Sequence, residues 1–426
     1  MAIGAANQLK SNSTSSNQNY IRPFITIVMI FAVWGIMGAL NDVLTNHLKK
    51  AFTLTELQSS LVQSAFFAGY FLAAIPAGKI IHKLGYKNGI LIGLGLCILG
   101  CALFFPAADY RVYGFFLGAL LIIAFGCTFL EVAANPYASI LGSSETAASR
   151  LNLAQGFNAL AKTLAAYAGT KLILGDKELS VEQIKAMTAS QFEIFQIEAA
   201  NSVKGPYLGL IILLVVFAIA IYFADLPEIE EEGDQSIDTS NKSLFDFPHL
   251  MLGVLAIFFY VGAQEGVGGK LFSYLEYLKL ENLTTEFKAI CLTTFLGIFM
   301  AGRFVGAWIM TKIDAAKMLV LFATISAILS LLCSVLSGYA AVGCLIAIGF
   351  FNSIQFSTIF TLAIKNLGSF TKQGSTYLIM GICGAAILPA LMGYISDISN
   401  IQLAMLTPFV CYLYVVYYGW IGCKIR

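Results

Sequence analysis

Charged residues are scarce in this chain of 426 residues. It contains 25 Lys and Arg and 24 Asp and Glu, or 12% of the sequence, whereas a soluble globular domain has about 25%. Hydrophobic residues make up 58%, and the mean hydropathy is +0.80. So few charges cannot cover the surface of a soluble protein of this length, and so many apolar residues exclude disorder. The composition therefore indicates a protein whose surface faces mainly lipid.

Other absences exclude further classes of function. The net charge is only +1, so the sequence carries no excess of basic residues for binding nucleic acid. All nine cysteines lie in apolar runs, where packing thiols are expected rather than disulfides, zinc or redox sites. The three histidines fall at the ends of apolar segments and form no nucleophile–base set. We therefore expect no enzyme, no cofactor and no metal site.

Long hydrophobic runs are the main feature that is present. Since about 20 apolar residues cross a bilayer, the chain has twelve candidate membrane-spanning helices. They cover about residues 23–45, 57–82, 88–106, 112–136, 147–174, 205–225, 248–279, 285–311, 315–336, 339–364, 373–397 and 402–423. An even number places both termini on one side, and the distribution of Lys and Arg favours the cytoplasm. The sequence thus predicts an all-α, multi-pass integral membrane protein with cytoplasmic termini.

The connections between the spans suggest the domain boundaries. Residues 1–21 begin with a stretch rich in Ser, Asn and Gln, and we expect a flexible cytoplasmic tail. Residues 175–204 are expected outside the membrane, with a short amphipathic helix. Residues 227–246 are acidic, which is typical of a solvated linker. We therefore expect an N-terminal six-helix bundle at 22–226, a cytoplasmic linker at 227–246 and a C-terminal six-helix bundle at 247–426.

Short matches relate the two bundles as an internal repeat. They lie 224, 226 and 224 positions apart, each at the equivalent helix, and pair Gly78 with Gly302, Leu141 with Leu367, and Gly169 with Gly393. Six helices is an even number, so both halves keep one orientation and are related by a pseudo-two-fold axis along the membrane normal. This arrangement is that of the major facilitator fold, in which the substrate site lies near the midplane and transport proceeds by rocking one half against the other.

Residues 78–87 resemble the signature loop of that superfamily between the second and third spans. Gly78 permits close helix approach, Gly85 permits the tight turn, and Lys83 and Lys87 hold the loop in the cytoplasm. His82 stands where the signature usually has an acidic residue, which affects the customary salt bridge and not the fold. Arg303, near the cytoplasmic end of the eighth span, is interpreted as a structural latch.

Polar side chains inside the predicted spans form the candidate site. An ionised group at the bilayer centre costs about 2.5–3.5 kcal/mol, and a polar stripe facing lipid would leave its hydrogen bonds unmade. These groups must therefore face the bundle interior or a water-filled cavity. The candidates are Asn41, Asp42, Glu131, Gln155, Asn158, Lys162, Tyr260, Gln264, Glu265, Asn352 and Gln355. Amides and carboxylates suit a sugar, whose hydroxyls both donate and accept hydrogen bonds.

Several blocks resemble the fucose–glucose–galactose branch of the major facilitator superfamily. They are residues 41–44, 66–71, 76–79, 130–137, 150–158, 260–264, 353–356 and 359–368. The resemblance implies a sugar:cation symporter, with a proton as coupling ion, in a bacterial inner membrane. It implies that Asp42 carries the proton, that Glu131 couples protonation to sugar, and that Gln155 and Asn158 line the cavity. Besides sugar, proton and lipid we expect no partner, and a monomer.

Two residues depart from the usual pattern of this branch, and they leave alternatives open. Lys162 stands where a small residue is usual, and Glu265 where a small or neutral one is usual. As an internal counter-ion, Lys162 would permit uncoupled or sodium-coupled sugar transport. It would also suit a different solute, such as an amino sugar or an organic anion. A sensor would need a cytoplasmic output domain, for which the predicted loops and tails are too short.

Overall fold

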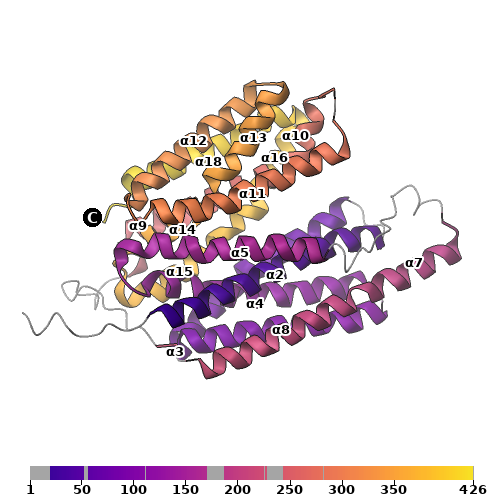
Figure 1. The fold of residues 1–426 in the computed structure, drawn as a ribbon, viewed down its shortest axis with the longest axis horizontal. Helices are drawn as coiled ribbons and strands as arrows, with labels where there is room; N and C mark the ends of the chain where they lie inside the picture. Colours follow the sequence, from indigo (N-terminus) through magenta and orange to yellow (C-terminus); the bar gives the residue numbers. More distant parts are fainter. Residues whose placement is uncertain are drawn as a thin grey trace, which may run out of the picture.

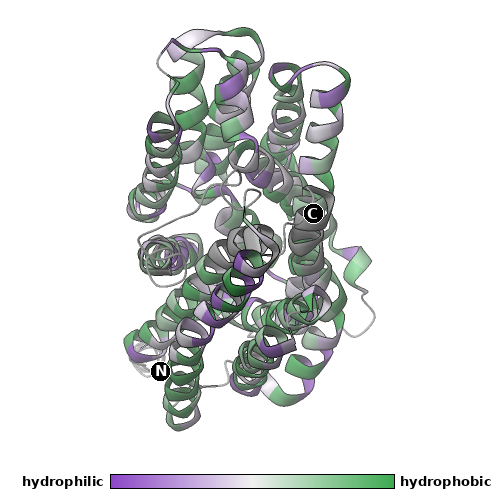
Figure 2. Ribbon diagram, turned by 90° about the vertical axis from the view of Figure 1, so that its right-hand side faces the viewer, coloured by the Kyte–Doolittle hydropathy of each residue, from purple (hydrophilic) through white to green (hydrophobic). Residues whose placement is uncertain are grey.

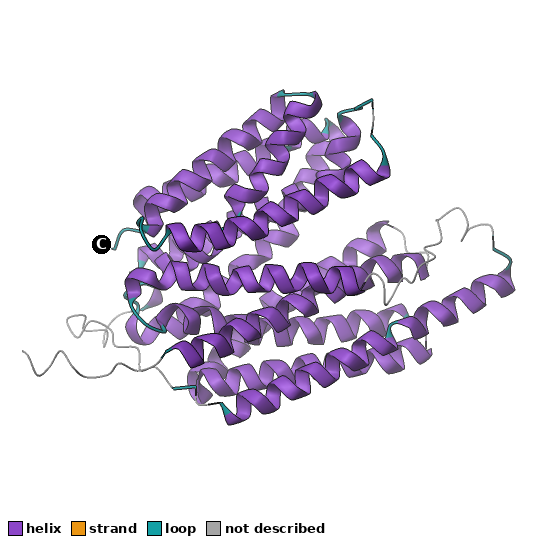
Figure 3. Cartoon of the chain, viewed as in Figure 1, coloured by secondary structure: helices purple, strands orange, loops and turns teal. Residues whose placement is uncertain are grey.

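The computed structural model is a bundle of helices (Figure 3). It describes residues 20–51, 56–110, 112–169, 187–224, 226–227, 243–281 and 283–425, and the side chains of 41–51, 56–65, 169, 189, 200 and 285 stay outside this description. Every regular element in these ranges is helical. Most of the expected tail (1–21) and of the expected linker (227–246) lies outside the described residues, so both expectations stay predictions.

In the first half, the six predicted spans correspond to five long helices. They are α2 (Ile21–Ala51), α3 (Glu56–Tyr110), α4 (Tyr113–Ile140), α5 (Ala147–Gly169) and α8 (Lys204–Phe223). The helix α3 contains two spans, and Gly85 separates them with a φ of 83° and a ψ of 170°. Only glycine adopts this backbone conformation without strain. The turn predicted at Gly85 is therefore confirmed.

Two shorter helices accompany the first half, η1 (Ser144–Thr146) and α7 (Ala189–Ser202). The helix expected within 175–204 is present as α7, and residues 175–186 of this segment lie outside the described residues. It leads almost directly into α8 through Val203 and extends beyond its neighbours (Figure 1). A Thr188 capping box fixes where α7 begins.

In the second half, four predicted spans are interrupted. The elements are η3 (Leu244–Asp246), α9 (Pro248–Gly269), α10 (Leu271–Tyr277), α11 (Thr285–Ile309), α12 (Ala315–Val335), α13 (Gly338–Asn352), α14 (Gln355–Ala363), η4 (Gly368–Phe370), α15 (Thr371–Met380), η5 (Gly381–Cys383), α16 (Gly384–Ile398), α17 (Ile401–Ala404), α18 (Leu406–Tyr417) and η6 (Tyr418–Gly422). The eleventh span breaks at η5, where Gly384 lies so close to the Phe258 carbonyl that a Cβ would collide with it. The glycine is needed for close packing on α9, and its weak helix propensity favours a break in the helix at the same place.

Both halves show the same internal packing, as the repeat predicts. The first span of each half packs on the fifth, α2 on α5 and α9 on α16, and the third packs on the sixth, α3 on α8 and α12 on α18. A Cβ added at Gly35 or at Gly262 would meet a backbone carbonyl of the helix it packs on. The matched positions Gly142 and Gly368 both have positive φ, at 100° and 52°.

The outer surface has the apolar character of a membrane protein. Ten stretches of the described chain are long and apolar enough to cross a bilayer, with both spans of α3 counted as one stretch. Large hydrophobic side chains such as Phe71, Ile212 and Trp308 are exposed. Hydrophobic residues occupy much of every bundle helix (Figure 2). The helix α5 is absent from the ten because Asn152, Gln155 and other polar residues lower its hydropathy. Asn152 and Gln155, in the first half of its polar face, are buried between helices.

The two halves meet at one end of the molecule (Figure 1). We call the end at which α2 begins and the C terminus lies the terminal side, and the opposite end the distal side. The contacts between halves join α5 to α11 and α14, and α3 and α4 to α15. The predicted pseudo-two-fold axis relates the contact between α5 and α11 to the contact between α3 and α15. Toward the distal side, the helices of the two halves diverge.

Candidate functional site

A buried contact joins the polar stripe of α5 to α11 of the other half. Arg303 Nη1 donates to the Gln155 backbone carbonyl at 2.9 Å and to Gln155 Oε1 at 2.6 Å. Gln155 Nε2 in turn donates to Asn135 Oδ1 on α4 at 3.2 Å. Arg303 and Gln155 are only 7% and 2% exposed. Both polar atoms of the Gln155 side chain are therefore bonded within the protein in this conformation.

Tyr260 extends this polar set into the second half. Its hydroxyl lies 2.8 Å from the Asn352 carbonyl oxygen and is also hydrogen-bonded to Gln264 Oε1. Gln264 Nε2 donates to Glu265 Oε1 at 3.2 Å, and both of these side chains are half-buried. Tyr260 and Arg303 interact electrostatically. Four predicted site residues of α9 and α13 thus lie next to the contact between the halves.

Gln355 occupies a different environment from the other predicted site residues. It is fully buried, and its Nε2 donates to Ser326 Oγ on α12 at 3.0 Å and to the Phe351 carbonyl at 2.9 Å. A longer contact of 3.4 Å reaches Asn352 Oδ1. These bonds connect α14 to α12 within one half. The structure therefore places Gln355 in helix packing, adjacent to the polar set through Asn352.

Glu131 lies on α4 with 3% of its surface exposed. Thr128 and Asn135 share its helix face, as their spacing predicts. Their side chains bond their own helix, Thr128 Oγ1 to the Ala124 carbonyl at 2.8 Å and Asn135 Nδ2 to the Glu131 carbonyl at 3.1 Å. Glu131 Oε2 has no hydrogen-bond partner among the described residues. The carboxyl group is thus enclosed but incompletely bonded.

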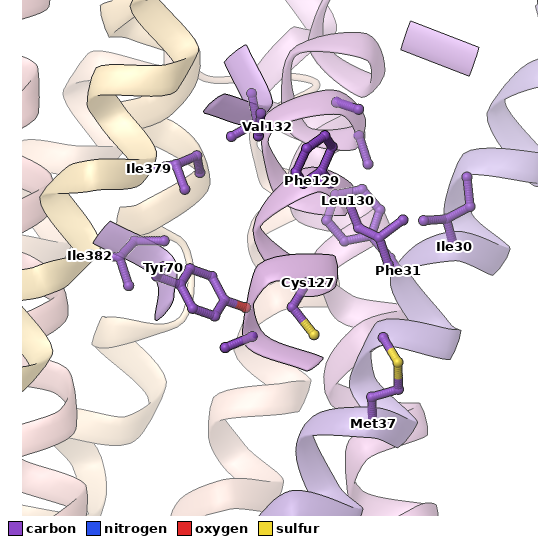
Figure 4. Packing of buried hydrophobic residues seen from close by; sticks show 14 of the residues in the cluster. Ile30, Phe31, Met37, Tyr70, Cys127, Phe129, Leu130, Val132, Ile379 and Ile382 are labelled. Atoms are coloured by element: carbon purple, nitrogen blue, oxygen red, sulfur yellow. The ribbon is translucent and has the colours of Figure 1, made fainter. Parts of the chain in front are cut away.

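Tyr70 is the neighbour of Glu131 on the adjacent helix. Its hydroxyl interacts with the Glu131 carboxyl group and with the side chain of Trp34 on α2. Figure 4 shows Tyr70 directed toward α4 beside Cys127, in one hydrophobic cluster with Ile382 of the other half. Tyr70 appears in the sequence as one aromatic among several, and only the structure reveals that it pairs with Glu131.

The distal part of the α5 stripe faces α2. Asn158 Nδ2 donates to the Phe31 carbonyl at 2.8 Å, and Gly35 lets the two helices approach at this level. Lys162 lies one turn farther along α5 and is exposed. Asn41 and Asp42 belong to α2, but their side chains lie outside the described residues, so their predicted roles stay predictions.

The signature loop lies against the other half at the terminal side. Gly78 is so close to Thr376 on α15 that a Cβ would collide with the threonine side chain, which confirms the predicted close approach. Lys87 Nζ donates to the Ala224 carbonyl at 2.8 Å and so binds the end of α8. Lys83 is exposed. The ammonium group of Lys372 lies 4.9 Å from the ring centre of Tyr86 and supplies a cation–π contact between the halves.

Ser149 is a contact residue that the sequence analysis does not identify. Its hydroxyl donates to the Ala307 carbonyl on α11 at 2.7 Å, one turn from the Arg303 contact. The signal was present in the sequence, because Ser149, Asn152 and Gln155 follow one another at steps of three and continue the polar stripe to the start of α5. Within the described ranges, no group of His, Cys, Asp and Glu is arranged to hold a metal ion.

Comparisons with known proteins identify the family. The Major Facilitator Superfamily model matches residues 24–381. A glucose/galactose transporter of Brucella abortus is 41% identical over 96% of both chains, and an L-fucose-proton symporter of Escherichia coli is 37% identical over 93% of this chain and 92% of that protein. The crystal structure of the transporter FucP in the outward conformation has a TM-score of 0.86, with 36% identity over 94% of this chain and 99% of that one. The chain is therefore a transporter of the major facilitator superfamily and belongs to the branch that contains the glucose/galactose transporters and L-fucose-proton symporters.

Proposed function

We propose that the protein carries a monosaccharide of the fucose or hexose type across the membrane by alternating access, coupled to proton symport. The observation that carries this proposal is the presence, in one bundle, of an enclosed carboxyl group, Glu131, and of an amide-rich polar set that both halves contribute. Amides can bond the hydroxyls of a sugar, and a carboxyl group can carry a proton. The names of the relatives support both parts of the proposal.

The roles of the individual residues follow from this proposal. Asp42 accepts the proton and Glu131 couples it to sugar occupancy. The sugar contacts come from Asn41, Gln155, Asn158, Lys162, Tyr260, Gln264, Glu265 and Asn352. Gln355, which was a candidate for the same role, instead holds α14 against α12 beside Asn352. Gly78, Lys83, Gly85, Lys87 and Arg303 act in gating. The protein works as a monomer in a bacterial inner membrane, with lipid around it.

The proposed orientation determines which state of the transport cycle this conformation represents. With cytoplasmic termini, the terminal side faces the cytoplasm, and contact between the halves at that side corresponds to an outward-facing state. The likeness to an outward structure of FucP supports this interpretation. Protonation then permits the transition, because a neutral carboxyl group can be enclosed without the large cost of burying a charge.

We expect Asp42→Asn to abolish uphill transport, because an amide cannot carry a proton. The measurement is sugar accumulation in proteoliposomes under an imposed pH difference, and the expected ratio of internal to external sugar falls to about 1. One pH unit drives about tenfold accumulation in a symporter that couples one proton to one sugar. Wild-type accumulation by the Asp42→Asn variant would show that another group carries the proton.

Lys162 is the observation that favours a second function, uncoupled or sodium-coupled sugar transport. It is exposed on α5, one turn from Asn158, where a fixed ammonium group can act as a counter-ion. In that case the wild type performs sugar counterflow without proton uptake, and Lys162→Ala makes transport depend on the proton gradient. If Lys162→Ala instead loses all sugar binding, Lys162 contacts the sugar directly. An affinity for an organic anion or an amino sugar in a thermal-shift panel would point to a different solute.

A further inference from the structure

Both polar atoms of the Gln155 side chain are hydrogen-bonded within the protein in this conformation. Its Oε1 accepts from Arg303, and its Nε2 donates to Asn135. The residue is 2% exposed. Because the amide is enclosed, a sugar entering from the distal side can reach it only if the helices around it move apart. Its burial therefore separates Gln155 from Asn158, which is half-buried on the same helix, although both are polar groups of the same site.

Gln155 is in turn the residue that accepts the hydrogen bonds of Arg303. The guanidinium group is 7% exposed, and Nη1 makes both of its hydrogen bonds to Gln155. Its Nε has no partner among the described residues, and the ring of Phe299 lies 4.7 Å from Cζ. A buried cation needs such contacts to offset its lost hydration. Most of the bonds that hold Arg303 therefore cross from one half to the other.

We propose that Arg303 and Gln155 form a conformation-specific latch that holds the terminal side closed, and that Gln155 becomes available to the sugar only when this latch opens. The proposal rests on the alternating-access transport proposed above. Rocking the halves apart at the terminal side separates α5 from α11 and breaks both hydrogen bonds. The Gln155 amide is then exposed on the side from which the sugar leaves. Arg303 thus acts as a positioning residue, through Gln155.

Hydrogen–deuterium exchange on the full chain in lipid nanodiscs tests this proposal without any sugar. We expect Arg303→Gln to raise amide exchange about tenfold or more in peptides 141–155 and 303–313, since hydrogen bonds to charged groups are among the strongest in proteins. Exchange in the distal peptides 271–281 and 336–341 should fall as the distal side closes. Gln155→Ala should give the same pattern, and the double variant should add nothing, because both changes remove one interaction.

Two controls separate a latch from a general loss of stability. Ser330→Ala removes a buried hydrogen bond within one half, from Ser330 Oγ to the Met405 carbonyl at 2.8 Å, and should change exchange only locally. Arg303→Lys keeps the charge on a single donor nitrogen, and should restore part of the wild-type pattern. Additive effects of Arg303→Gln and Gln155→Ala would overturn the proposal. So would weaker sugar binding by Gln155→Ala with unchanged exchange, which would make Gln155 a direct sugar contact in this state.

Discussion

Glu131→Gln is expected to abolish proton-driven accumulation of sugar while leaving sugar binding and exchange intact. The side chain is 3% exposed and lies beside Tyr70, and one carboxyl oxygen has no hydrogen-bond partner among the described residues. Glutamine has nearly the shape of a protonated glutamate and stays neutral, so the halves can still close over the sugar. Because no proton enters or leaves at this position, closure is no longer tied to the proton gradient.

The measurement compares two modes of transport in the same proteoliposomes. Under a difference of one pH unit, the wild type should accumulate sugar about tenfold and the Glu131→Gln variant should not accumulate it. In counterflow, where no gradient is needed, the variant should retain at least about half of the wild-type rate, since its neutral side chain avoids the cost of burying a charge. Loss of counterflow together with accumulation would instead assign Glu131 to sugar binding or to folding.

Gly78→Ala is expected to prevent the terminal side from closing. A Cβ at this position would lie 2.9 Å from Thr376 Cβ and 3.0 Å from Thr376 Cγ2, and closer still to the hydroxyl. Thr376 cannot easily move away, because it is 5% exposed and its hydroxyl donates to the Lys372 carbonyl at 3.0 Å. Overpacking of this kind costs about 1–3 kcal/mol, which shifts the balance between conformations about 5- to 150-fold.

Counterflow rates measure this effect, because counterflow requires both conformations. Gly78→Ala should lower the rate at least about fivefold, in line with the cost of overpacking. Gly95→Ala is the matched control, since nothing lies within 4 Å of its added Cβ, and its rate should stay at the wild-type level. Adding Thr376→Gly to Gly78→Ala removes the clashing atoms and should restore transport. Equal rates for Gly78→Ala and Gly95→Ala would mean that α3 and α15 do not approach this closely during the cycle.

The fold was predictable because its signals are local. A hydrophobic run of about 20 residues identifies a span wherever it occurs, and a glycine such as Gly85 marks the turn that only it can form. The repeat was visible because matched glycines have the same structural task in both halves, as the positive φ of Gly142 and Gly368 shows. The breaks in the second half were not predictable, because they depend on which helix a residue such as Gly384 packs against.

The candidate site was predictable only as a set of residue types. Membrane burial forces polar residues to find partners, so the sequence correctly indicates that Gln155, Tyr260 and Asn352 are enclosed. It does not indicate which partners they find. The bond between Gln155 and Arg303 joins two halves that are far apart in the sequence, and the bond between Gln355 and Ser326 turns a candidate sugar contact into part of the helix packing.

The most direct test of the proposed function is uptake by the purified wild-type protein. Proteoliposomes are given radiolabelled fucose, glucose, galactose or N-acetylglucosamine, with proton and sodium gradients imposed separately. We predict that at least one of the neutral sugars accumulates when the proton gradient is present and fails to accumulate with the sodium gradient alone. Accumulation driven only by sodium, or no uptake of any of these sugars under either gradient, would contradict this prediction.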